Sequence, residues 1–182
     1  EFCYPYERPP LSKDYLLDKM TLDQCFFFPK DFYEENKINF IFNTKINNFD
    51  FKNKKITSND NKLFTYDKLL IATGSTNRYL KFNGEYLVPD ENLIYLRNSK
   101  ESEGIKNKIK SSNNILIIGG GFIGLEIASS ASQLKKNVII LERGNQLMGR
   151  VIPKQIAKLV QERHEKNGNK IHLNVDIKKI NK

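Results

Sequence analysis

The 182-residue sequence predicts an α/β protein, in which part of a domain with an antiparallel β-meander precedes a three-layer domain with a parallel sheet. Two observations predict this class. Apolar residues alternate with a period of two through much of the segment 38–66, which is typical of paired strands. From Ile115 onward, short apolar runs alternate with helical patterns, which is typical of strand–helix–strand units.

The segment before the meander predicts loops and short helices. Pro9 and Pro10 are unsuited to a helix interior but can open a helix, so we expect one over residues 12–19. Residues 21–31 are interpreted as an aromatic-rich loop and residues 32–36 as a second short helix.

The meander is expected to contain three strands. They are residues 38–51, 55–58 and 62–66, with an Asn-Asp-Asn turn at residues 59–61. The meander ends in residues 69–72, an apolar run with the composition of a buried strand.

The second half begins with a polar, loop-like segment, residues 77–112, in which only residues 93–96 are apolar. We place the crossover between domains at residues 97–113. Strands are then predicted at 115–118, 138–141 and 170–175, and helices at 121–134 and between Pro153 and Gly168.

The strongest motif is a glycine-rich loop between the first of these strands and its helix. Gly119, Gly121 and Gly124 fit the pattern G-x-G-x-x-G, with Phe122 and Ile123 between the last two. The first glycine allows a tight turn, the second lets a pyrophosphate approach the backbone, and the third lets helix and strand pack closely. The free amides at the helix N-terminus then face the phosphates. This pattern predicts a Rossmann-like NAD-binding domain.

Glu142 ends the next strand, 23 positions after Gly119 and near the spacing of about 20 expected for a ribose-binding acid. A carboxylate there accepts both ribose hydroxyls and repels a 2′-phosphate, so we favour NAD over NADP. Arg143 follows directly and favours the phosphorylated cofactor. The alternative to a nucleotide site is a glycine-rich turn with a surface glutamate.

Glu126 lies near the start of the same helix and has two interpretations. A carboxylate stabilises a helix N-terminus electrostatically. It can also face the nicotinamide and a second cofactor, and spacing alone leaves both open.

Three segments taken together resemble a known family. They are Arg-Pro-Pro-Leu-Ser-Lys at 8–13, Tyr-Asp-Lys-Leu-Leu-Ile-Ala-Thr-Gly-Ser at 66–75, and the glycine-loop region 117–126. In this order they resemble the FAD-dependent pyridine nucleotide-disulfide oxidoreductase superfamily. The similarity is to the ferredoxin and rubredoxin reductases that serve oxygenases and are related to apoptosis-inducing factor. The resemblance implies a partial FAD-binding domain in residues 1–97 and a partial NAD-binding domain in residues 98–182.

The resemblance also implies an activity. It suggests a flavoprotein that passes hydride from NADH to FAD, and then single electrons to a ferredoxin or rubredoxin. Lys13 and Glu126 are the implied catalytic pair beside the flavin. Two alternatives stay open: an NAD-binding or redox-sensing protein like apoptosis-inducing factor, and an inactive fragment.

Further cofactor-binding residues are implied by the resemblance alone. They are Arg8 and Pro9 at the flavin, Ile46 at the adenine, Thr73 and Gly74 at a strand end, Arg97 at the flavin, and Arg150 at the NAD adenosine end. The family's disulfide reductases carry a Cys-x4-Cys pair near residues 8–13, and this sequence has none there, so we expect no dithiol relay. The family's FAD glycine loop is also absent, and we expect a piece of a longer protein.

Composition argues against several other classes of protein. The net charge is +9, but the basic residues are scattered, so we expect no nucleic-acid partner. No apolar window reaches the roughly 18 residues of a membrane helix, so no membrane partner is expected. Two cysteines indicate reduced thiols in a cytoplasmic protein, and two histidines predict no metal site.

Overall fold

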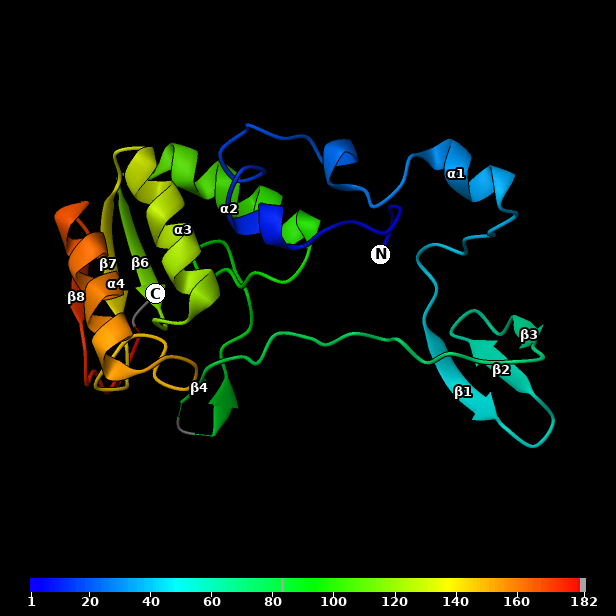
Figure 1. The fold of residues 1–182 in the computed structure, drawn as a ribbon. Coiled ribbons are helices and arrows are strands. Elements are labelled where there is room, and N and C mark those ends of the chain that lie inside the picture. Colours follow the sequence, from blue (N-terminus) through cyan, green and yellow to red (C-terminus); the bar gives the residue numbers. More distant parts are fainter. Residues whose placement is uncertain (83, 181–182) are drawn as a thin grey trace. The chain divides into compact units, whose positions relative to one another are not determined.

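The computed structural model describes residues 1–82 and 84–180 (Figure 1). The chain forms two compact units. The first unit comprises residues 1–6 and 26–76, and the second comprises residues 7–25 and the chain from Asn77 onward. Each unit has its own sheet with the connectivity that the sequence predicts, so the α/β class is confirmed.

The first unit contains the predicted antiparallel meander. Strands β1 (Ile46–Asp50), β2 (Lys55–Ser58) and β3 (Leu63–Thr65) pair in the order β1-β2-β3. Helix α1 (Lys30–Glu35) agrees with the short helix expected near this point. The meander is therefore confirmed, with a first strand that begins later than predicted.

Two predictions for this unit are wrong. Residues 38–45 form no strand; the ring of Phe40 instead packs edge-on against Tyr33 at 4.9 Å and stacks on Phe42 at 5.4 Å. The run 69–72 is not a buried strand, since Leu70 is 87% exposed. A buried strand needs hydrogen-bonded neighbours, and no described segment pairs with this run.

The second unit begins with short helices. The 3₁₀ helices η1 (Pro9–Ser12) and η2 (Asp23–Cys25) are joined by turns. The helix predicted over residues 12–19 is wrong, because the prolines open a 3₁₀ helix that ends where an α-helix was expected to begin. A small hairpin follows, with β4 (Lys81–Phe82) and β5 (Glu85–Tyr86).

Helix α2 (Ser99–Ser111) replaces much of the loop predicted over residues 77–112. Asn98 caps it: the Asn98 side chain accepts from the Glu101 amide at 2.9 Å, and the Glu101 carboxylate accepts from the Asn98 amide at 3.2 Å. Its buried stripe includes Ser102 and Lys106 as well as isoleucines, so hydrophobicity alone did not reveal it.

The core of the second unit is a parallel sheet. Strands β6 (Asn114–Ile118), β7 (Asn137–Leu141) and β8 (Lys170–His172) pair in that order. Helix α3 (Phe122–Gln133) packs on β6 and β7, and α4 (Lys154–Lys166) packs on β8. Strand β8 is shorter than predicted, while the other elements agree closely with the expected strand–helix–strand unit.

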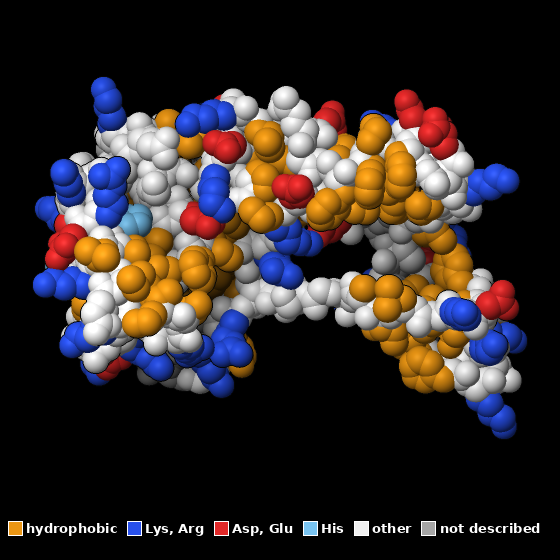
Figure 2. All heavy atoms as spheres, in the orientation of Figure 1, with side chains coloured by type: hydrophobic (Ala, Val, Ile, Leu, Met, Phe, Trp, Pro, Cys, Tyr) orange, Lys and Arg blue, Asp and Glu red, His pale blue; other side chains and the backbone are white. Residues whose placement is uncertain are grey.

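Two surface properties complete the description. On the face drawn in Figure 2, Lys and Arg side chains are spread over both units and form no continuous stripe. Among the described residues, no helix combines the length and apolarity needed to cross a membrane.

Candidate functional site

The glycine loop lies at the carboxyl end of β6. Gly119 has φ +108°, a conformation that L side chains rarely adopt, so glycine is required at this turn. The Gly119 amide donates to the Leu141 carbonyl at 2.8 Å, which fixes the loop to the end of β7. Helix α3 begins at Phe122, so its first amides lack intrahelical acceptors.

The other two motif glycines have different local requirements. A Cβ at Gly124 would overlap the Gly119 carbonyl oxygen and would lie 3.2 Å from Cγ2 of Ile117. This position therefore permits the close contact between α3 and β6. A Cβ at Gly121 would meet no atom within 4 Å, so the loop has open space at its centre. That space is where a phosphate can approach the amides.

Glu142 is held at the end of β7 by two backbone amides. Its Oε2 accepts from the Gly120 amide at 2.7 Å, and its Oε1 accepts from the Gly144 amide at 2.6 Å. Each oxygen keeps a further lone pair for another donor. The structure thus gives a carboxylate of fixed orientation directly beside the glycine loop.

Lys13 and Glu126 form an ion pair. Nζ of Lys13 lies 2.8 Å from Oε1 of Glu126 and also donates to the Pro9 carbonyl at 3.2 Å. The Lys13 side chain is 44% exposed and that of Glu126 29% exposed. The pair therefore joins the Pro-Pro-Leu-Ser-Lys segment to the second turn of the glycine-loop helix while keeping a cation accessible.

A second charged cluster holds the chain beyond Lys13 against α2. Nζ of Lys106 lies 2.7 Å from the Glu103 carboxylate and 3.0 Å from the Asp18 carboxylate. It also lies over the ring of Tyr15, 4.6 Å from the ring centroid. The Tyr15 hydroxyl donates to Glu103 at 2.9 Å. Burial raises the pKa of Tyr15, and the hydrogen bond to Glu103 raises it further, to about 12. These contacts fix the turns that follow Lys13.

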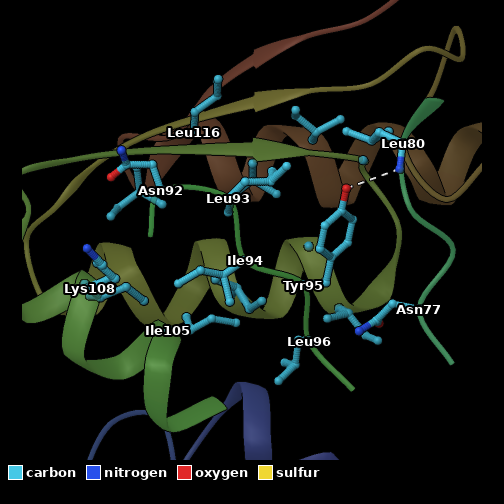
Figure 3. Close-up of a pocket in the computed structure, with 18 of the residues that line it drawn as sticks. Asn77, Leu80, Asn92, Leu93, Ile94, Tyr95, Leu96, Ile105, Lys108 and Leu116 are labelled. Carbon is cyan, nitrogen blue, oxygen red and sulfur yellow. Dashed lines mark hydrogen bonds between the residues drawn. The ribbon is translucent and has the colours of Figure 1, made fainter. Parts of the chain in front are cut away.

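A cavity of about 820 Å³ lies next to the glycine loop (Figure 3). Its walls come from residues 93–96, from Ile105 on α2 and from Leu116 on β6, and the lining includes Gly119 and Gly121 of the loop. The hydroxyl of Tyr95 accepts from the Leu80 amide at 3.2 Å and fixes part of the wall. An apolar cavity beside a few polar groups is typical of a small-molecule site.

Comparison with known proteins agrees with this geometry. The profile of the pyridine nucleotide-disulphide oxidoreductase family matches residues 3–182. The chain belongs to this family. It is 35% identical over 180 residues to a rubredoxin-NAD(+) reductase from Ectopseudomonas oleovorans, covering 99% of this chain and 46% of the relative. A terpredoxin reductase from Pseudomonas sp is 32% identical over 99% of this chain and 42% of its own length.

Solved structures of the family share the fold. A ferredoxin reductase from Rhodopseudomonas palustris matches with a TM-score of 0.90 and 29% identity, over 100% of this chain and 44% of its own. Putidaredoxin reductase, in its covalent complex with putidaredoxin, matches with a TM-score of 0.91 and 27% identity, over 97% of this chain and 42% of its own. The chain spans less than half the length of these relatives.

The remaining candidate residues divide between the two units. Nη1 of Arg8 donates to the Arg97 carbonyl, so those two residues meet in the second unit. Arg150 is exposed and lies on a turn. The Met148 amide of this turn donates to the Gly120 carbonyl at 2.9 Å, which fixes the turn to the glycine loop. Phe122 and Ile123 are about half exposed at the start of α3.

Three candidate residues belong to the first unit. Ile46 begins β1 and pairs with Ser58, Thr73 lies in an irregular segment, and Gly74 has φ +68°. Their role toward a cofactor stays a prediction, as does the role of the residues in the second unit.

Three serines that form hydrogen bonds beside the Lys13–Glu126 pair or on α2 were not predicted from the sequence. Ser12 donates to Oε2 of Glu126 at 2.5 Å, Ser130 donates to the Ser12 carbonyl at 2.8 Å, and Ser102 donates to the Leu11 carbonyl at 2.5 Å. Ser130 follows Glu126 by four residues, so the two side chains share one face of the helix, and this spacing could have identified Ser130 from the sequence.

Proposed function

We propose that the protein carrying this chain transfers hydride from NADH to FAD and then passes single electrons to a ferredoxin or rubredoxin. The observation that carries the proposal is the Lys13–Glu126 ion pair, which connects the Pro-Pro-Leu-Ser-Lys segment with the helix of the glycine loop. In this proposal residues 1–97 belong to an FAD-binding domain and residues 98–182 to an NAD-binding domain.

The residues present fit a dinucleotide at the glycine loop. The open space at Gly121 and the free amides at the start of α3 would hold the pyrophosphate of NADH. Glu142, fixed by Gly120 and Gly144, would accept the hydroxyls of the adenosine ribose and would repel a 2′-phosphate. Phe122 and Ile123 would border the dinucleotide, and Arg150 would lie near its adenosine end.

The residues around Lys13 fit a flavin that gains negative charge on reduction. The Lys13 ammonium is paired and yet its side chain is 44% exposed, so its positive charge stays accessible. FAD, when bound, supplies the change from two-electron to one-electron transfer. Lys13 would stabilise the developing negative charge, and Glu126 holds the ammonium in place. Arg8, Pro9 and Arg97 would line the same side.

The named relatives support the electron acceptor. One relative is named a rubredoxin reductase, and putidaredoxin reductase has been solved joined to putidaredoxin. The net charge of +9 would attract an acidic carrier and would make the rate of reduction fall as salt rises. Ile46, Thr73 and Gly74 are proposed as further FAD-binding residues.

We place the protein in the cytoplasm. Cys25 is buried and its thiol donates to the Thr21 carbonyl at 3.3 Å, as expected of a reduced cysteine. A cytosolic compartment keeps such thiols reduced.

The test uses the FAD-loaded protein produced from the complete reading frame. Lys13→Ala is expected to slow reduction of the flavin by NADH about tenfold or more at saturating NADH, with a smaller change in NADH affinity. Lys19→Ala is the matched control, because Lys19 is exposed and its ammonium lies 3.5 Å from Oε1 of Gln133, away from the Lys13–Glu126 pair. Wild-type reduction by Lys13→Ala would contradict the proposal.

A further inference from the structure

Ser12 is a buried residue whose hydroxyl contacts the ion pair. It is 3% exposed, and its Oγ lies 2.5 Å from Oε2 of Glu126, while Nζ of Lys13 lies 2.8 Å from Oε1. The two oxygens of Glu126 are thus bound by consecutive residues, a neutral hydroxyl on one and an ammonium on the other. A hydrogen bond to a carboxylate is stronger than one between neutral groups.

Helix α3 holds Ser12 at two points. Glu126 accepts the Ser12 hydroxyl, and Ser130, one helical turn later, donates its own hydroxyl to the Ser12 carbonyl at 2.8 Å. Ser130 is 2% exposed and its contact with the Ser12 carbonyl is buried, while the contact between Ser12 and Glu126 is partly buried. Residue 12 is fixed in this way directly before Lys13.

Contact with Lys13 alone would leave the carboxylate loosely oriented. The terminal torsion of a glutamate side chain is broad and roughly two-fold, so one contact does not fix the plane of its oxygens. Lys13 is also a flexible side chain that is 44% exposed. A second contact on the other oxygen removes the freedom to rotate, and in this structure Ser12 supplies it.

We propose that Ser12 is a positioning residue that fixes the Glu126 carboxylate, and through it the Lys13 ammonium, for reduction of the flavin. This inference rests on the function proposed above. Ser12 touches neither nucleotide in this account and acts only through Glu126. Its removal should therefore affect the rate of hydride transfer to the flavin and leave binding of NADH nearly unchanged.

The experiment measures the limiting rate of flavin reduction and the NADH dissociation constant, anaerobically, in the FAD-loaded protein from the complete reading frame. Ser12→Ala is expected to lower the rate about tenfold, the value of one hydrogen bond to a charged group. The NADH dissociation constant should change less than about threefold. Ser12→Cys, which keeps a similar shape with only a weak donor, should lower the rate too and provides a second variant if alanine unfolds the protein.

Ser58→Ala is the matched control. Ser58 is a buried serine whose hydroxyl also donates to a lysine-paired carboxylate, that of Asp60, which lies 2.7 Å from Lys62. Ser58 thus makes the same kind of contact as Ser12, a hydroxyl donating to a lysine-paired carboxylate, but within the meander. We expect Ser58→Ala to reduce the flavin at the wild-type rate.

A double variant separates positioning from folding. In a Glu126→Ala background, Ser12→Ala should lower the rate by less than about twofold, because the carboxylate that it positions is gone. An equal loss in both backgrounds, or a wild-type rate for Ser12→Ala, would overturn the inference while the proposed function stands. A wild-type rate for Glu126→Ala would overturn both.

Discussion

Replacing Gly121 with alanine separates the role of the glycine loop in binding from its role in folding. Gly121 has φ −84° and ψ −179°, which any residue can adopt, and a Cβ there would meet no atom within 4 Å. The fold therefore accepts the methyl group. The same methyl group would occupy the space through which a pyrophosphate reaches the amides of α3.

The two expected effects differ in size. Gly121 is the N-cap of α3, and alanine at an N-cap costs about 1 kcal/mol relative to a good cap. Two hydrogen bonds from loop amides to a charged phosphate are worth about 3–6 kcal/mol together. Losing them raises the NADH dissociation constant about 10²- to 10⁴-fold. The variant should thus stay folded and lose its NADH affinity.

NADH titration of the FAD-loaded protein, together with denaturant unfolding, measures both quantities. Gly104→Ala is the control, because Gly104 lies within α2 and a Cβ there also meets no atom within 4 Å. It should stabilise the protein by about 0.5–1 kcal/mol and leave NADH affinity unchanged. A folded Gly121→Ala protein with NADH affinity within about threefold of wild type would refute this assignment of the loop.

Two further predictions concern stability. Lys106→Met keeps the buried aliphatic stem but loses two partly exposed ion pairs and a cation–π contact, so the free energy of unfolding should fall by about 1–2 kcal/mol. Lys110 is 56% exposed, so Lys110→Met should lower the free energy of unfolding by less than about 0.5 kcal/mol. Denaturant unfolding measures both variants, and an equal loss of stability in Lys106→Met and Lys110→Met would contradict this prediction. Burial lowers the pKa of His164 from 6.5, and its Nδ1 lies 3.2 Å from the Asn169 amide nitrogen. As pH falls, His164 is therefore protonated in the unfolded chain before it is protonated in the folded protein, so stability should fall as pH drops below about 6.5. The thermal midpoint of His164→Gln should depend less on pH over that range than the midpoint of the wild type. The same pH dependence in both proteins would contradict this prediction.

The parallel unit was predictable because its signals come from the backbone. The turn at Gly119 requires a positive φ, and the contact at Gly124 leaves no room for a side chain. Such requirements restrict the sequence to glycine at fixed positions. The apolar strands on either side are restricted on one face, where Val138 and Ile140 are almost fully buried, while Leu116 on the other face is 59% exposed.

Helix α2 was missed because its buried stripe is partly polar. Ser102 and Lys106 are buried alongside Ile105 and Ile109, so the hydrophobic period is weak. The capping pair of Asn98 and Glu101 was visible in the sequence and identifies the start of the helix.

The run 69–72 and Phe40 show the opposite error. Both have the composition of strands, but strand formation depends on partners that a local pattern does not contain. Phe40 finds aromatic neighbours instead, and residues 69–72 have no paired strand among the described residues. Ser12 was missed for a related reason, since its partner lies 114 positions away.

Anaerobic mixing of the FAD-loaded protein with NADH tests the central claim most directly. The flavin should lose its colour rapidly with NADH and more slowly with NADPH, because Glu142 would repel the additional phosphate. Oxidised ferredoxin or rubredoxin added afterwards should restore the colour as it becomes reduced. A flavin that NADH fails to bleach, or that bleaches without passing electrons to either carrier, would contradict the account.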